Sequence, residues 1–265
     1  CALGYEVLWT RVLTIAVGAS VYGFTLILVA FLTGIALGSK AYGASLALVR
    51  GNGSDARRPI AWFGSTQVII GVTALLVTVY LRDIPANAIR LQNMLFSGAP
   101  SSFGARVWAN FALALLYTAI PALFMGAAFP MAGDVLARRS HGIGRAVGNV
   151  LAANTVGAIL GAAVSGIFLI QQFGIERSLQ ILTVINVGLG LTVLASLRRG
   201  TWLPVAFAAT TMAVILALGF NPDVLTLWDR QYFAIFRSNQ PEAFSTAEKI
   251  REAVENTDVL YYAEG

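Results

Sequence analysis

Hydrophobic residues fall in long runs along this chain, and short polar segments separate the runs. A helix needs about 20 apolar residues to cross the hydrocarbon core of a bilayer. Lipid offers the backbone no hydrogen-bond partners, so a spanning run of this kind is helical. The pattern predicts an all-α integral membrane protein, a bundle of about seven transmembrane helices with a short water-soluble C-terminal tail. The predicted spans are about 1–17, 19–48, 60–81, 106–136, 145–173, 178–197 and 202–220.

Small residues recur at every fourth position of the stretch 145–173, where they share one helical face. These positions are Asn149, Ala153, Gly157, Gly161 and Ser165. The span 19–48 carries a similar repeat that includes Gly34 and Gly38. Small faces let two membrane helices approach closely, so we interpret both as helix-packing surfaces and 145–173 as the packing spine of the bundle. The alternative is that glycine and alanine are simply frequent in membrane helices.

Two further segments depart from a plain spanning helix. Pro121 and Pro130 fall inside the span 106–136, and each removes a backbone donor, which predicts a kinked or broken helix. Broken helices often line transporter cavities, whereas kinks are also ordinary in packed bundles. Between the third and fourth spans, apolar residues at helical spacing over 84–95 predict a short helix lying in the membrane interface.

Four polar side chains within the spans are candidate functional groups: Glu6, Arg11, Asn110 and Asn154. Ionisable groups at membrane depth are costly and are functional candidates by default. Glu6 and Arg11 are five residues apart, so they lie on different faces of a helix and each needs its own partner. A structural or interfacial role is favoured over transport or proton transfer, and interhelical hydrogen bonds explain the asparagines adequately.

Composition narrows the class of protein. Charged residues make up only 12% of the chain and hydrophobic residues 57%, with a mean hydropathy of +0.73. A soluble domain has about 25% charged residues, so an ordinary soluble protein is excluded. The net charge of +5 resides in short connections between apolar runs. We therefore expect the lipid bilayer as a partner, together with other membrane subunits or a second copy of the chain, and no nucleic acid.

The basic connections also indicate an orientation. Arginine-rich segments follow the second, fourth and sixth spans, at 50–59, 137–145 and 198–200. Short loops rich in Lys and Arg stay in the cytoplasm, so these three connections are predicted to be cytoplasmic. With seven spans, the C-terminal tail would then be extracytoplasmic.

The two ends of the sequence differ in character. Apolar residues begin directly at Cys1, so we interpret the first span as truncated rather than Cys1 as a processed, lipidated N-terminus. The tail 221–265 is rich in acidic residues, and Ser245 and Glu248 form a capping-box pattern that predicts a helix to about Asn256. An extended segment at 259–262 is expected next. Such a tail is expected to lead into a further soluble domain.

No motif for catalysis, cofactor binding or metal binding is recognisable in the chain. The phosphate-loop and zinc-protease patterns are missing from the sequence, and the glycines between Gly142 and Gly148 match a nucleotide fingerprint only loosely, with no strand before them. His141 lies among arginines in a loop and is expected to be solvated. We therefore assign no catalytic, cofactor-binding or metal-ligating residue.

Several segments together resemble a known family. They are Gly4–Arg11 (GYEVLWTR), Gly18–Tyr22 (GASVY), Gly34–Ser39 (GIALGS), Pro121–Pro130 (PALFMGAAFP), Gly144–Gly148 (GRAVG), Ala153–Gly161 (ANTVGAILG) and Asp258–Gly265 (DVLYYAEG). This series resembles the membrane region of the multi-pass, major-facilitator-like bacterial proteins in which a membrane bundle is fused to a spermidine synthase-like domain, a polyamine aminopropyltransferase.

The resemblance implies a scaffold in the bacterial inner membrane. Residues 1–220 would form an anchoring bundle, and any transferase activity in polyamine biosynthesis would belong to a downstream domain whose functional residues have no counterparts here. Two other functions stay open at this point. One is a secondary transporter of small solutes, cationic solutes among them, and the other is a non-catalytic subunit that packs into a larger membrane complex.

Overall fold

The protein is all-α over the part that the computed structural model describes, which comprises residues 1–18, 20–49, 57–96, 102–137, 143–197, 202–220, 227–228, 248–249 and 252. Those residues form helices and short turns and contain no β-strand, which confirms that the fold is all-α. The helices are α1 (Ala2–Val17), α2 (Val21–Val49), α3 (Arg57–Leu81), α4 (Ile84–Phe96), α5 (Phe103–Ala137), α6 (Ile143–Ala163), the π-helical turn η1 (Val164–Leu169), α7 (Ile170–Ala195) and α8 (Trp202–Phe220).

Within the described ranges, four helical stretches are long and apolar enough to cross a membrane: Val21–Ser45, Arg57–Leu81, Phe103–Ala137 and Val147–Ala195. Leu203–Ala217 is apolar but shorter. The predicted spans 145–173 and 178–197 both lie within the last long stretch, because helical structure resumes directly after the chain reverses. In the tail, Glu248, Lys249 and Glu252 are helical, whereas His141, most of the predicted helix 245–256 and the extended segment 259–262 lie outside the described residues.

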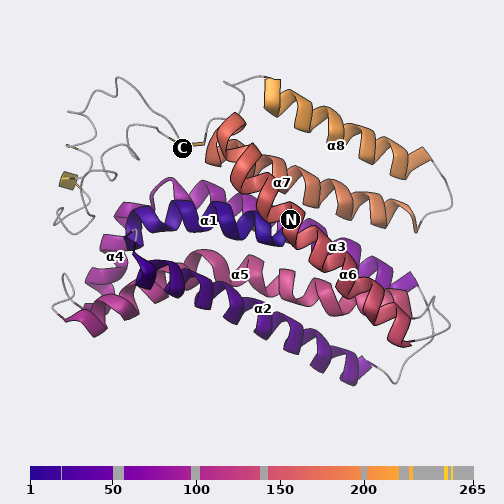
Figure 1. Cartoon of the computed structure of the whole chain (residues 1–265), viewed down its shortest axis with the longest axis horizontal. Helices are drawn as coiled ribbons and strands as arrows, with labels where there is room; N and C mark the ends of the chain where they lie inside the picture. The colour runs from indigo at the N-terminus through magenta and orange to yellow at the C-terminus, as the bar shows by residue number, and fades with distance from the viewer. Residues whose placement is uncertain are drawn as a thin grey trace.

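The chain reverses direction at Gly174, near the start of α7 (Figure 1). Its backbone has φ 73° and ψ 174°, a conformation that side-chain-bearing residues rarely adopt and glycine adopts readily. The Ser178 hydroxyl donates a hydrogen bond of 2.5 Å to the Gly174 carbonyl oxygen. The turn predicted after residue 173 is therefore confirmed, and a single glycine makes it.

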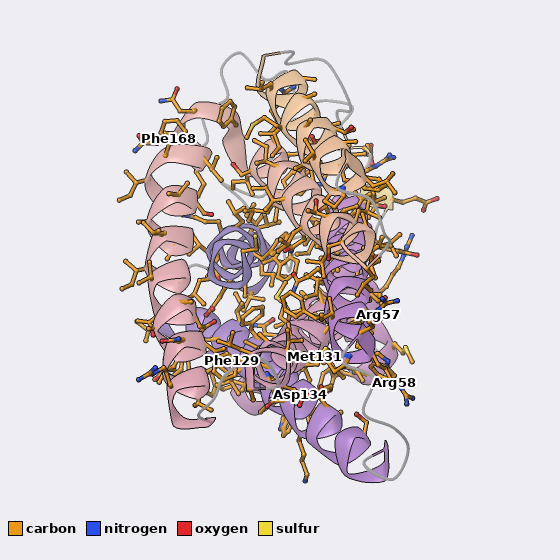
Figure 2. All side chains as sticks on the ribbon, turned by 90° about the vertical axis from the view of Figure 1, so that its right-hand side faces the viewer. Arg57, Arg58, Phe129, Met131, Asp134 and Phe168 are labelled. Atoms are coloured by element: carbon orange, nitrogen blue, oxygen red, sulfur yellow. The ribbon has the colours of Figure 1, made fainter. Side chains whose placement is uncertain are left out.

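Five helices lie side by side in the order α2, α5, α3, α7 and α8 (Figure 1). Helix α1 packs against this layer, and α6 covers α1 and also contacts α5. Figure 2 shows α1 end-on in the middle of the bundle, with α6 upright to its left. The layer therefore encloses α1 on one side and α6 encloses it on the other.

Helix α1 forms the centre of the hydrophobic core. Tyr5, Leu8, Trp9, Val12 and Leu13 are each at most 1% exposed. The Trp9 ring stacks on Tyr5 with a centroid distance of 5.0 Å. Side chains of this size each make many van der Waals contacts with the helices around them, so α1 is the centre of the packing.

The bundle has two distinct ends (Figure 1). At one end α2 and α5 terminate and α3 and α6 begin; Arg57, Arg58 and Arg145 are exposed there, and we call it the basic end. The opposite end carries α4 and the Gly174 turn, and we call it the α4 end. The described helix termini on either side of the connections 50–56 and 138–142 thus meet at one end, in agreement with the predicted alternation of spans.

Helix α5 runs unbroken from Phe103 to Ala137, with Pro121 and Pro130 inside it. A broken helix at the two prolines, one of the two forms we expected, is therefore wrong. Each proline removes only one donor, and α2 and α3 pack along this helix and hold it together. Pro121 is itself buried.

The short helix predicted at 84–95 is present as α4 (Ile84–Phe96). Its apolar side is turned toward the bundle only over the first part of the helix, because Ile84 and Ala88 are buried whereas Leu95, near the end, is exposed. The helical structure is confirmed, and a position in the membrane interface stays a prediction.

Candidate functional site in the helix contacts and the α4 end

Helices α2 and α5 approach each other through glycines on both sides. A Cβ atom added to Gly38 would lie 2.6 Å from the carbonyl carbon of Leu123, and one added to Gly126 would lie 2.6 Å from the Cα of Ile35. A Cβ on Gly34 would also meet α5 at 2.6 Å. Separations this short leave no space for a side chain, so the two backbones are in direct contact. Two of these three glycines were predicted as packing residues from their four-residue spacing.

A second close contact joins α3 to α7 and was not predicted from the sequence. A Cβ on Gly190 would lie 2.6 Å from the carbonyl oxygen of Gly64, and one on Gly71 would lie 3.1 Å from that of Thr183. Gly64 and Gly71 are seven residues apart, a spacing that places them on one face and could have indicated this contact. Gly188 packs against Thr211 of α8. It is two residues from Gly190, so the two glycines lie on different faces of α7 and their spacing does not indicate a common contact.

The small-residue stripe of α6 packs over only part of its length. A Cβ on Gly161 would lie 3.6 Å from the backbone nitrogen of Gly4, and a Cβ on Gly4 would lie 2.6 Å from the hydroxyl oxygen of Ser165. The other three positions of the stripe are exposed: Asn149, Ala153 and Gly157. A Cβ on Gly157 would have no described atom within 4 Å. Within this chain, the tightest backbone contacts therefore lie between α2 and α5.

A buried polar contact joins the central helix α1 to α7. The Asn186 side-chain amide donates to the Tyr5 hydroxyl at 3.3 Å, and that hydroxyl donates to Thr183 Oγ1 at 3.5 Å. All three side chains are at most 6% exposed. Hydrogen bonds between helices of this kind fix their register, because the alternative is an unpaired polar group in an apolar core.

We expect Tyr5→Phe to lower the stability of the bundle by about 0.6–1.7 kcal/mol, which are the average and the largest values measured for interhelical hydrogen bonds in a membrane protein. The change keeps the ring and removes the hydroxyl that pairs with Asn186 and Thr183. Unfolding by dodecyl sulfate in mixed micelles measures the difference. Tyr22→Phe, at a largely exposed ring, is the matched control and should have no effect. Equal stability of both variants and the parent protein would contradict this role of Tyr5.

The four polar candidates from the sequence lie in separate contacts. The Asn110 amide donates to the carbonyl oxygen of Val17 at 3.4 Å and so fastens the end of α1 to α5. Glu6 is half-buried on α1, Arg11 is exposed on the same helix, and Asn154 is exposed on α6. The structure therefore does not gather them into a single site.

The carbonyl groups at the end of α3 accept hydrogen bonds from side chains of other segments. The last carbonyl groups of a helix lack partners within it. The Trp228 indole nitrogen donates to the Thr78 carbonyl oxygen at 2.6 Å, and the Tyr117 hydroxyl donates to that of Tyr80 at 3.3 Å. Asn87 of α4 in turn donates to the Tyr117 hydroxyl at 2.9 Å. Helices α3, α4 and α5 are thus joined at the α4 end.

Residues 227–228, beyond α8, are attached to the same end of the bundle. Trp228 is 9% exposed and belongs to the main hydrophobic core. The backbone N–H of Leu227 donates to the Glu176 carboxylate, which also accepts from the Gln180 amide at 3.3 Å. This attachment was not predicted, because no local pattern relates Trp228 to α3, which lies 150 residues earlier.

Among the described residues, no three His, Cys, Asp or Glu side chains are close enough together to hold a metal ion. A cavity of about 440 Å³ lies between α2, α3 and α5, and Glu6 does not line it. No protein-family model, curated protein or solved structure matches this chain.

Proposed function

We propose that this chain is the membrane-anchoring scaffold of a spermidine synthase-like protein. In this proposal residues 1–220 span the membrane about seven times, and the bundle supplies no catalytic group. Any aminopropyl transfer would then take place in a soluble domain downstream of the spans.

The apolar outer surface supports membrane anchoring. Large hydrophobic side chains are exposed along the outward sides of the long helices, among them Leu76 on α3, Ile120 on α5, Ile159 on α6 and Val205 on α8. In water, exposed apolar surface of this extent drives aggregation, whereas lipid chains cover it at no cost. This surface is the observation that carries the proposal.

The family assignment rests on the segments quoted from the sequence. Gly4, Gly34, Gly38, Gly126 and Gly161 belong to those segments, and each lies where two helix backbones approach closely. Residues in such contacts determine how helices pack, which fits the role of a scaffold.

Reporter fusions test the membrane topology. With the basic end in the cytoplasm, green fluorescent protein fused after Gly53 or Gly200 should fluoresce, and alkaline phosphatase fused there should be inactive. Phosphatase fused after Ser20 or Gly98 should be active, because only exported phosphatase folds. Membranes washed with alkaline carbonate should retain the chain. Release by carbonate, or the same reporter result at all four positions, would contradict the proposed topology.

Intact-mass measurement of the native polypeptide tests the second half of the proposal. A spermidine synthase-like fusion should have a mass well above the 28.1 kDa of this sequence. A native polypeptide of 28.1 kDa would rule out the fused domain and leave only the membrane bundle.

A further inference from the structure

A groove opens between α2 and α3, and α5 forms its floor. Its volume is about 440 Å³, within the range of small-molecule sites. The walls consist largely of small residues, such as Gly38 and Ala41 on α2 and Ala61 on α3, while Phe124 and Met131 of α5 lie at the floor. The groove lies where α2 and α3 both pack on α5, and Tyr42 of α2 and Trp62 of α3 are the large side chains in its walls.

The lining of the groove suits a hydrocarbon chain better than a polar solute. The Ser45 hydroxyl donates to the Tyr42 carbonyl oxygen at 2.8 Å, and the Thr66 hydroxyl donates to the Met131 sulfur at 3.3 Å. These hydroxyl hydrogens are already used, so they are not offered to a ligand. The remaining lining is dominated by carbon atoms of residues such as Leu123.

The length of the groove corresponds to one leaflet of a bilayer. Its lining on α3 extends from Ala61 to Ile69, and eight residues of helix rise about 12 Å. Half of the hydrocarbon core is about 15 Å thick. A spanning helix from a partner protein would contact α2 and α3 across the full thickness of the bilayer. An acyl chain occupies only one leaflet, which matches the length of the groove.

Positive charge lies at the mouth of the groove. Arg58, Trp62 and Ser65 share one face of α3, because they are separated by four and three residues. Arg58 is exposed one turn beyond Trp62, toward the basic end, and Arg57 adjoins it. Asp134 of α5 is half-buried at the same end (Figure 2). The two positive charges of Arg57 and Arg58 outnumber its single negative charge.

We propose that this groove binds one acyl chain of an anionic phospholipid, with the lipid phosphate beside Arg58. The proposal rests on the proposed membrane embedding of the chain. Trp62, which is 47% exposed, then lies at the level of the headgroups, where tryptophan is enriched in membrane proteins. The basic end thereby acquires a lipid site that selects for negative charge.

Native mass spectrometry of the delipidated full chain tests the proposal, with phosphatidylglycerol and phosphatidylcholine of identical acyl chains added in equal amounts. We expect one phosphatidylglycerol to bind preferentially. Arg58→Gln should weaken phosphatidylglycerol binding about fivefold, the effect of one cation near an anionic lipid surface. Phosphatidylcholine binding should fall by less, because the choline cation offsets the charge of its phosphate. Arg106→Gln, at an exposed arginine at the start of α5 near the α4 end, is the matched control and should not change either lipid.

A second measurement places the acyl chain in the groove. Phosphatidylglycerol with brominated acyl chains should quench the fluorescence of Trp62, obtained as the difference between the parent protein and Trp62→Phe. Ser65→Phe should fill the groove and abolish this quenching while the melting temperature is retained. Equal binding of the two lipids, no effect of Arg58→Gln, an unquenched Trp62, or a co-purified polypeptide protecting the groove would each overturn the proposal. Carbonate release of the chain would instead contradict the membrane embedding itself.

Discussion

Gly38→Ala and Gly126→Ala are each expected to destabilise the bundle by about 2–3 kcal/mol, toward the upper part of the range for overpacked cores. The added methyl group would collide with the backbone of Leu123 in the first variant and of Ile35 in the second. A backbone cannot rotate aside as a side chain can, so α2 and α5 must separate along their whole contact. This loss of stability exceeds the gain of up to about 1 kcal/mol that alanine brings over glycine in a helix interior.

Dodecyl sulfate titration in mixed micelles measures these losses, and two glycines on the same helices provide matched controls. A Cβ on Gly43 of α2 or on Gly133 of α5 would have no described atom within 4 Å. Gly43→Ala and Gly133→Ala should therefore be neutral or stabilising by up to about 1 kcal/mol. If all four variants had the same stability, close α2–α5 packing would not hold the bundle together.

Trp228→Ala is expected to cost about 3–5 kcal/mol, and Trp228→Phe about 1–3 kcal/mol. Alanine removes both the buried ring and the hydrogen bond to the Thr78 carbonyl oxygen, while phenylalanine removes the donor and keeps most of the apolar volume. Hydrogen exchange should show faster exchange of the amide hydrogens at the end of α3 in both variants, because this helix end is no longer held through the Thr78 carbonyl group and opens more often.

Trp108, an exposed tryptophan, provides the control for the loss of an indole ring at a site without buried contacts. Trp108 on α5 is 67% exposed, so Trp108→Phe should change stability by less than about 0.5 kcal/mol and leave exchange at α3 unchanged. Retention of full protection at the end of α3 in Trp228→Ala would show that residues 227–228 do not stabilise it.

The helices were largely predictable from the sequence because their signals are local. Long apolar runs located α2, α3 and α5 to within a few residues, and Gly174 marked the reversal near the start of α7. The proline-containing span was the exception. Pro121 weakens a helix locally, but contacts with α2 and α3, which lie far away in sequence, keep α5 continuous.

The candidate packing residues were predictable only in part. The four-residue repeat was informative on α2, where Gly34 and Gly38 meet α5. The same spacing on α6 identified a common face, but Gly157 on that face has no neighbour in the described chain. A repeat shows which residues share a face, whereas the presence of a partner depends on where the other helices lie.

By itself, the sequence determined that the described part of the chain is helical, that its long helices have the length of membrane spans, and where they are separated. Those properties depend on hydrophobicity, helical periodicity and backbone conformation within short segments. The tertiary structure alone decided that the short helix α1 occupies the centre, that α2 and α5 form the closest contact, and that Trp228 returns to the end of α3. Each of these pairs residues far apart in the sequence, and such contacts are set by packing and hydrogen bonding in three dimensions.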